Sequence, residues 1–335
     1  MNNQSVLVNL AAFVIVCAGL SAATSIVVPF FLAIFISIAL TPILDLFARV
    51  HVRRIFAILI LVFIFFELLW FLGNIIFSAI NSLSTDLPVY RDKFAFSMAQ
   101  TIEWLNSHNI KVSSVVIDTV DPDKIFSTAS SFLRQTGDIV TKSFLVLLFV
   151  IFMLVDVSIF SDKVKYFSIR YPQATVIVNN FIANLKRYIV IKTISSIATA
   201  LILYPILLHF NVPYAMLWAL LAFILNYIPT IGSIIAAFPA IMLSLLLNDF
   251  SDALWVSGAY LVVNIAIGNF IEPRFLGSSL GISTLVVILS LVFWGFLLGV
   301  GGMFMAVPLT MSVKIALNES KKTKFISVLL SDKKE

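Results

Sequence analysis

The sequence has little charge, one cysteine and three histidines. Of its 335 residues, 12% are charged and 61% are hydrophobic, whereas soluble globular domains have roughly 25% and 45–50%. This composition excludes a soluble enzyme, a disordered protein and a disulfide scaffold. β-Barrels of membranes show short alternating segments instead of long apolar runs. The expected fold class is therefore all-α, a polytopic helical membrane protein.

The motifs that carry enzymatic chemistry are also missing. There is no Walker loop, no CxxC or HExxH, and no visible set of nucleophile, base and orienting group. We therefore expect no enzyme, no cofactor and no metal site. The net charge of +5 favours basic cytoplasmic loops over nucleic-acid binding, because of where the lysines and arginines lie. Cys17 lies inside the first apolar run and is expected to be a small helix residue.

Apolar runs of about 20 residues, enough to cross a bilayer, occur repeatedly before residue 157. They are Val6–Ala23, Ile26–Leu44, Ile55–Phe77 and Ile139–Val155. These runs predict N-terminal transmembrane helices over residues 1–77 and a further transmembrane helix over residues 139–156.

The segment 78–138 between these spans is richer in acids and turn signals. Apolar residues recur at helical spacing in Tyr90–Leu105 and in Lys124–Leu133, and Val112–Val120 has the pattern of a short strand. We expect residues 78–138 to form a small extracytoplasmic amphipathic domain.

Residues 157–192 contain six bases, namely Lys163, Lys165, Arg170, Lys186, Arg187 and Lys192, and one acid. Their apolar residues fall on one helix face, which predicts a cytoplasmic or interfacial amphipathic helix. With residues 318–335 as a basic cytoplasmic tail, the positive-inside rule places both termini in the cytoplasm.

Residues 193–317 form an almost continuously apolar C-terminal transmembrane core with helix breaks. The expected breaks are Asn211–Pro213, Ile228–Gly232, Asn248–Asp252, Glu272–Gly281 and Gly299–Gly302. Several pieces between them are too short to cross a bilayer alone, which predicts broken or re-entrant helical hairpins.

One of these breaks is repeated. Residues 231–239 read IGSIIAAFP and residues 300–308 read VGGMFMAVP, so Gly232 and Pro239 align with Gly301 and Pro308. Paired short segments interrupted by glycine and proline are typical of transporter binding sites. The alternative is that small residues and prolines are simply common at helix contacts in membranes.

Three ordered motifs resemble those of the autoinducer-2 exporter family, the PerM-type permeases. They are LNYIPTIGS at 225–233, NFIEPRFLG at 269–277 and FWGFLLGVGG at 293–302. The resemblance covers nearly the whole chain and implies a bacterial inner-membrane permease with about eight spans. It also implies export of the quorum-sensing signal autoinducer-2, a small hydroxylated furanone, or sodium or lithium/proton antiport.

Ionisable groups at membrane depth are costly and point to function. Glu272 is the leading candidate, as a proton site or as an acceptor for solute hydroxyls, with Arg274 as the adjacent cation. The alternative is a structural ion pair or a cap that fixes the loop. Glu67, in the middle of a span, is the second candidate for proton or ion coupling, or else it bonds a neighbouring helix.

Uncharged polar residues complete the candidate site. Asn226, Asn264 and Asn269 suit a neutral polyhydroxylated solute, although interhelical bonding is the alternative for each. The full set of expected substrate-binding or transport residues is Asn226, Pro229, Gly232, Pro239, Asn264, Asn269, Glu272, Pro273, Arg274, Gly277, Gly281, Gly301, Gly302 and Pro308.

The leading functional hypothesis is a secondary transporter that exports a small polar solute, with autoinducer-2 favoured. A sodium or lithium/proton antiporter and a non-transporting membrane scaffold are the alternatives. The expected partners are the lipid bilayer, the solute or a monovalent cation, and further copies of this chain in a homo-oligomer. No nucleic-acid partner is expected.

Overall fold

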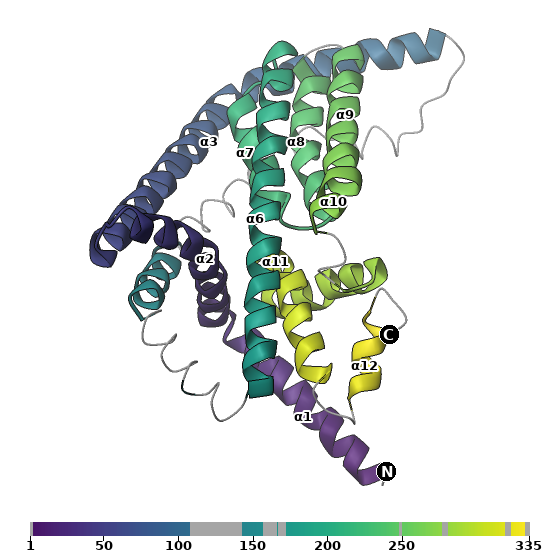
Figure 1. Cartoon of the computed structure of the whole chain (residues 1–335). Helices are drawn as coiled ribbons and strands as arrows, with labels where there is room; N and C mark the ends of the chain where they lie inside the picture. Colours follow the sequence, from purple (N-terminus) through teal and green to yellow (C-terminus); the bar gives the residue numbers. More distant parts are fainter. Residues whose placement is uncertain are drawn as a thin grey trace.

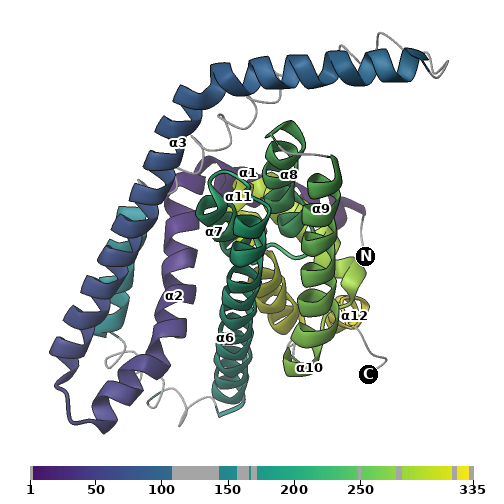
Figure 2. The same ribbon diagram turned by 90° about the horizontal axis from the view of Figure 1, so that it is seen from above.

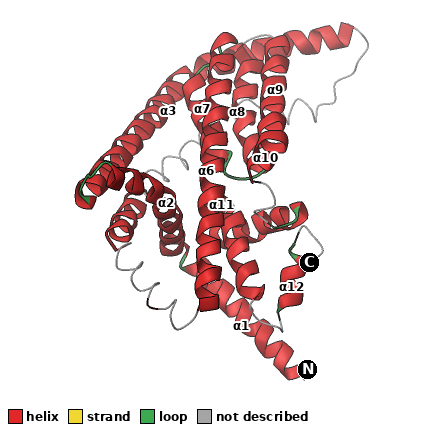
Figure 3. Cartoon of the chain, in the orientation of Figure 1, coloured by secondary structure: helices red, strands yellow, loops and turns green. Residues whose placement is uncertain are grey.

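The computed structural model describes residues 3–107, 143–156, 166, 172–247, 250–276, 281–318 and 323–331. The regular structure in these ranges is helical, without strands (Figure 3). Five of the described helices are long and apolar enough to cross a membrane, and several shorter helices are also apolar. The protein is therefore a polytopic helical membrane protein, as its composition predicts.

The N-terminal helices are α1 (Asn3–Ala22), α2 (Thr24–Arg49) and α3 (Arg54–Ser107). The apolar helix 143–156 packs with α2 and α3 around one hydrophobic cluster. At the beginning of α3, the Arg54 guanidinium donates a hydrogen bond of 2.9 Å to the carbonyl of Leu154. This bond fixes one end of the 143–156 helix against α3.

Helix α3 continues well beyond the membrane-crossing part, which ends at Ala79. The sequence predicts a change of structure at residue 78, but no glycine or proline interrupts the helix there, so the span runs on as a long extension (Figure 2). The helix expected over Tyr90–Leu105 is confirmed as part of this extension. The expected elements Val112–Val120 and Lys124–Leu133 lie outside the described residues.

Helix α6 (Pro172–His209) is the longest element of the C-terminal half. It contacts α7, α9 and α10 along one part of its length and α11 along another, and so it connects the α7–α10 helices with α11 (Figure 1). The sequence predicts a surface helix ending at residue 192, and this boundary is wrong because α6 passes straight through it. The helix contains no glycine, and Pro205 lies close to its end.

The first hairpin consists of α7 (Ala215–Leu225), the turn Asn226–Thr230 and α8 (Ile231–Leu247). Eleven residues make a helix of about 16 Å, too short for a hydrocarbon core of about 30 Å. The two helices approach so closely that a Cβ on Gly232 would lie 1.8 Å from the Leu225 carbonyl oxygen. Only glycine fits there, and the expected break is confirmed.

The second hairpin is formed within α11 (Thr284–Asn318), which turns at Gly299 with φ 65° and ψ −153°. The Trp294 indole N–H donates a 3.0 Å hydrogen bond to Thr310 Oγ1, although sixteen residues of straight helix would span about 24 Å. A Cβ on Gly302 would lie 2.1 Å from the Trp294 carbonyl oxygen. The chain therefore folds back on itself here, as the break at Gly299–Gly302 predicts.

When the two hairpins are compared by their contacts, the glycine that corresponds to Gly232 lies one residue later than the sequence alignment places it. The alignment pairs Gly232 with Gly301, but a Cβ on Gly301 would meet Val28 of α2. It is Gly302 that contacts the opposite arm of its own hairpin, as Gly232 does. The hairpins touch where Tyr227 stacks on Phe304, with ring centroids 6.2 Å apart.

The remaining helices complete the C-terminal half. Helix α9 (Phe250–Ile265) packs against α8 and continues through the π-helix η1 (Ala266–Ile271) into α10 (Glu272–Leu276). Helix α12 (Lys324–Leu329) packs against α11.

Candidate functional site

A cavity of about 480 Å³ lies among α6, the α7–α8 turn, α8, α9, η1 and α10. One part of its wall is polar, formed by Lys192, Asn226, Thr230, Ser233, Ser257, Tyr260, Asn264, Asn269 and Glu272. The rest is glycine, proline and apolar side chains. Small-molecule sites have this volume range and this mixture of apolar walls with a few polar groups.

An ion pair between Lys192 and Glu272 lies at this cavity. Lys192 Nζ is 2.8 Å from Glu272 Oε1 and 2.9 Å from Oε2. Lys192 is 4% exposed and Glu272 is 7% exposed. The cation beside Glu272 is thus Lys192, from α6, and not the sequence neighbour Arg274, which is exposed.

Lys192 is a residue of the candidate site that the sequence pattern does not predict, because it lies in a cluster of bases typical of a membrane surface. The apolar face that contains Leu185 and Tyr188 continues one turn further to Lys192, and all three side chains are buried. The spacing of three and four residues therefore places Lys192 on the same buried helix face as Leu185 and Tyr188, which is the sequence signal for its burial. It was hidden because a lysine is almost never fully buried unless paired, and the partner lies 80 residues later in sequence.

Helix α9 reaches Glu272 through the π-helix η1. The sequence predicts a break that begins at Glu272, but Pro273 occupies the first turn of α10, where a missing N–H is tolerated. The wider π-turn of η1 precedes it and allows α9, η1 and α10 to continue as one rod. The π-turn carries Gly268 and Asn269 into the cavity wall.

The three asparagines differ in their bonding. Asn226 Nδ2 donates a 3.1 Å hydrogen bond to Ser196 Oγ on α6, so this residue joins two helices and also lines the cavity. The amides of Asn264 and Asn269 make no hydrogen bond to another residue in the described part of the chain. The buried hydroxyl of Tyr260 likewise has no partner among the described residues.

The α7–α8 turn contributes a strained residue to the same wall. Thr230 has a φ of 63°, a conformation that is unfavourable for a β-branched residue and that marks a strained turn. Its carbonyl accepts a 2.9 Å hydrogen bond from Ser233 Oγ. Thr230 lies within the matched motif, but its residue type alone gives no hint of the positive φ.

Some of the other expected site residues line the cavity, and others do not. Pro229 lines the cavity with Asn226, Asn264, Asn269 and Glu272. Several lie within helices away from the cavity wall or at the hairpin contacts, namely Gly232, Pro239, Gly301, Gly302 and Pro308. Pro273 is exposed, Gly281 has a φ of 56° beside Lys314, and Gly277 lies outside the described residues.

Glu67, the second carboxylate candidate, does not line this cavity. It lies on the exposed face of α3. The described structure therefore brings only one of the two carboxylate candidates to the polar wall.

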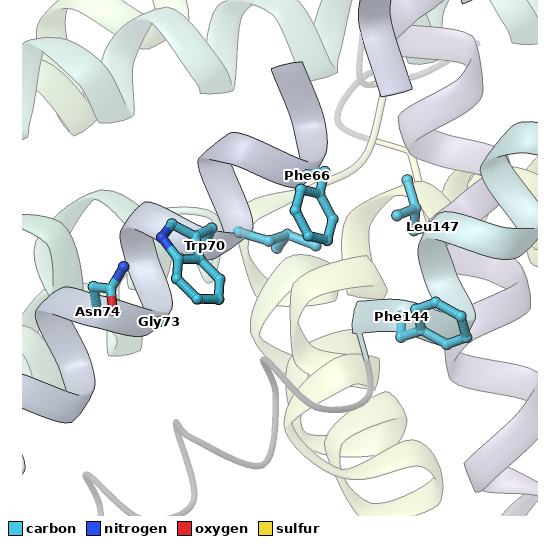
Figure 4. Close-up of a pocket in the computed structure, with 7 residues that line it drawn as sticks. Phe66, Trp70, Gly73, Asn74, Phe144 and Leu147 are labelled. Carbon is cyan, nitrogen blue, oxygen red and sulfur yellow. The ribbon is translucent and has the colours of Figure 1, made fainter. Parts of the chain in front are cut away.

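A second cavity, of about 330 Å³, lies between α3 and the 143–156 helix. Phe66, Trp70 and Asn74 reach it from α3, and Phe144 and Leu147 from the shorter helix (Figure 4). The described residues of its wall are almost entirely apolar, and none of them is charged.

Comparison with known proteins identifies the family. The family model described as "AI-2E family transporter" matches residues 10–322. The chain belongs to the AI-2E transporter family. It is 38% identical to the AI-2 transport protein TqsA of Escherichia coli (strain K12) over 333 residues, which cover 99% of this chain and 97% of that protein.

Other AI-2E relatives are similar over comparable lengths. A protein of Haemophilus influenzae named "Putative transport protein" is 35% identical and is covered to 97%, with 99% of this chain aligned. The protein of Escherichia coli (strain K12) named "Putative transport protein YhhT" is 33% identical, with 97% of this chain and 93% of that protein aligned. The resemblance expected from the three motifs is thus confirmed, and a permease role is supported.

Proposed function

We propose that this AI-2E family member is a permease of the bacterial inner membrane that exports a small polar solute, with autoinducer-2 as the favoured solute. The observation that carries this proposal is the cavity with two amides, Asn264 and Asn269, that have no hydrogen-bond partner among the described residues. Each amide can both donate and accept hydrogen bonds, which suits a hydroxylated furanone. The name of the relative TqsA, an AI-2 transport protein, favours the same solute.

The proposed mechanism is alternating exposure of the cavity to the two sides of the membrane. Its wall includes the turn of one hairpin, and the turn's Tyr227 stacks on Phe304 of the other hairpin. Broken helices at membrane depth are tolerated when they line a water-filled cavity. We place both termini in the cytoplasm, because this orientation puts most basic segments on the cytoplasmic side.

The homo-oligomer belongs to the same proposal. Glu67 is exposed on a membrane-crossing stretch of α3, and a carboxylate in contact with lipid is costly. A second copy of the chain that covers this face would remove that cost.

The test is flux of the hydroxylated furanone from proteoliposomes that contain the purified protein. The double substitution Asn264→Ala and Asn269→Ala removes two amides, each expected to be worth about 0.5–1.5 kcal/mol. We therefore expect flux to fall about tenfold. Asn74→Ala, a matched change at the apolar cavity, controls for the loss of an amide elsewhere. Equal flux in the double variant and this control would contradict the site assignment.

Antiport of sodium or lithium against protons is the second candidate, favoured by the carboxylate of Glu272 at the cavity. The same liposomes separate the two functions. Solute export by this route continues without a pH or sodium gradient across the membrane, whereas antiport requires one and moves the cation in the absence of the furanone.

A further inference from the structure

We propose that the Lys192–Glu272 ion pair makes the cavity selective by charge, so that it accepts neutral polyhydroxylated solutes and rejects anions and cations of the same size. This inference rests on the proposed function, since it concerns the same cavity. It assigns a role in specificity to Lys192 and gives its ion pair a consequence beyond stability.

The first observation is the balance of charge. Both oxygens of Glu272 contact the same Nζ atom of Lys192, at 2.9 Å or less, so each charge is met by the other. The other residues that line the cavity are amides, hydroxyls, glycine, proline and apolar side chains. Among the described residues, the wall therefore carries one positive and one negative charge and has no net charge.

The other charged side chains near this end of the site point elsewhere. Arg187 donates hydrogen bonds of 3.1 and 2.7 Å to the Phe275 carbonyl, and Arg274 is exposed. Neither of them lines the cavity. Neither can therefore serve as the counter-charge of a solute held between α8 and α9.

The second observation is where the charges lie. The pair is buried among membrane-crossing helices, where charges interact far more strongly than in water. A charged solute would give up its hydration without finding an unpaired counter-charge, and this loss is much larger for an ion than for a hydroxyl. A neutral solute avoids that cost.

The third observation is the supply of hydrogen bonds for hydroxyl groups. An ammonium group has three donors and a carboxylate has about four acceptor positions. The two hydrogen bonds between Lys192 and Glu272 therefore leave one donor and about two acceptor positions on a pair that lines the cavity. Asn264 and Asn269 add both kinds, and neither is used inside the described protein. Adjacent hydroxyls of a polyol, each donor and acceptor, match this arrangement.

The experiment compares three solutes of one size in proteoliposomes. They are erythritol, its carboxylate erythronate and its amine 1-amino-1-deoxyerythritol, with the hydroxylated furanone measured in parallel. The unmodified protein should transport erythritol at least about tenfold faster than either charged solute. Glu272→Gln leaves a net positive cavity and should shift the preference to erythronate. Lys192→Met leaves a net negative cavity and should shift it to the amine.

Two further variants keep the test decisive if a single substitution prevents folding. Lys192→Met combined with Glu272→Gln restores neutrality and should restore the preference for erythritol. Asn264→Asp adds one negative charge while it leaves the pair intact, and it should favour the amine. Lys324→Met and Glu103→Gln remove exposed charges outside the cavity, and they should leave the preference unchanged.

The outcomes distinguish this inference from the proposed function. Preferences that follow the net charge of the cavity support the inference. Unchanged preference for erythritol in Asn264→Asp and in every single variant that folds overturns it. Transport of the furanone without transport of erythritol overturns the inference but leaves the proposed function standing, whereas transport of neither contradicts both.

Discussion

The cavity at the ion pair and the cavity between α3 and the 143–156 helix differ in what surrounds them. The first lies among the C-terminal helices and is lined by a charged pair, amides and hydroxyls. The second lies between two helices whose outer faces are exposed, and its wall is almost wholly apolar. Polar groups at membrane depth are costly when they face lipid. They accumulate where α6, α9 and the α7–α8 hairpin surround them.

The largest expected effect concerns the charged pair itself. Lys192→Met or Glu272→Gln alone leaves a buried charge without its partner, which costs about 3–5 kcal/mol of stability. The combined substitution should recover most of this loss, because a neutral pair leaves no uncompensated charge. Thermal unfolding in detergent measures the loss of stability in the single variants and its recovery in the combined variant. If either single variant is as stable as Lys324→Met or Glu103→Gln, the pair does not stabilise this cavity.

The second effect concerns the hairpin that brings its turn to the polar cavity. Gly232→Ala places a Cβ 1.8 Å from the Leu225 carbonyl oxygen, which forces α7 and α8 apart and should cost about 1–3 kcal/mol. Gly258 of α9 has no atom within 4 Å of its added Cβ. Gly258→Ala should be neutral or stabilising by up to about 1 kcal/mol. Equal unfolding temperatures for the two variants would contradict the close hairpin contact.

The smallest effect is expected at the apolar cavity. Phe144 is 71% exposed, and lipid chains can replace its contacts because they are as apolar as the ring. Phe144→Ala should therefore change stability by no more than about 0.5 kcal/mol and leave furanone flux unchanged. A loss of flux as large as that of the Asn264 and Asn269 double variant would mean that both cavities serve transport.

Much of the fold follows from local patterns in the sequence. The helical type and the apolar runs depend on residues close to one another, and those predictions are confirmed. The break predicted at Ile228–Gly232 overlaps the observed turn Asn226–Thr230, and the break predicted at Gly299–Gly302 begins at the observed turn at Gly299. The boundary at residue 192 is wrong because its evidence was a cluster of bases. The sequence shows that these residues are basic, whereas the burial of Lys192 depends on Glu272, which is distant in the chain.

The candidate site divides in the same way. Asn264, Asn269 and Glu272 stand out by themselves, since polar residues within apolar runs are rare and costly. Lys192 and Thr230 do not stand out in the sequence. The place of Lys192 in the site depends on its contact with Glu272, and that of Thr230 depends on its positive φ. Arg274 shows the reverse case, as the cation nearest in sequence is exposed while Lys192 reaches Glu272 from α6.

By itself, the sequence determined the class of protein, the family and the places where the two hairpins turn, because hydropathy and glycine or proline act over a few residues. Only the tertiary structure decided which polar residues share one cavity and which cation neutralises Glu272. The physical reason is that an ion pair depends on distance in space. Lys192 and Glu272 are 80 residues apart in the chain and 2.8 Å apart in the fold.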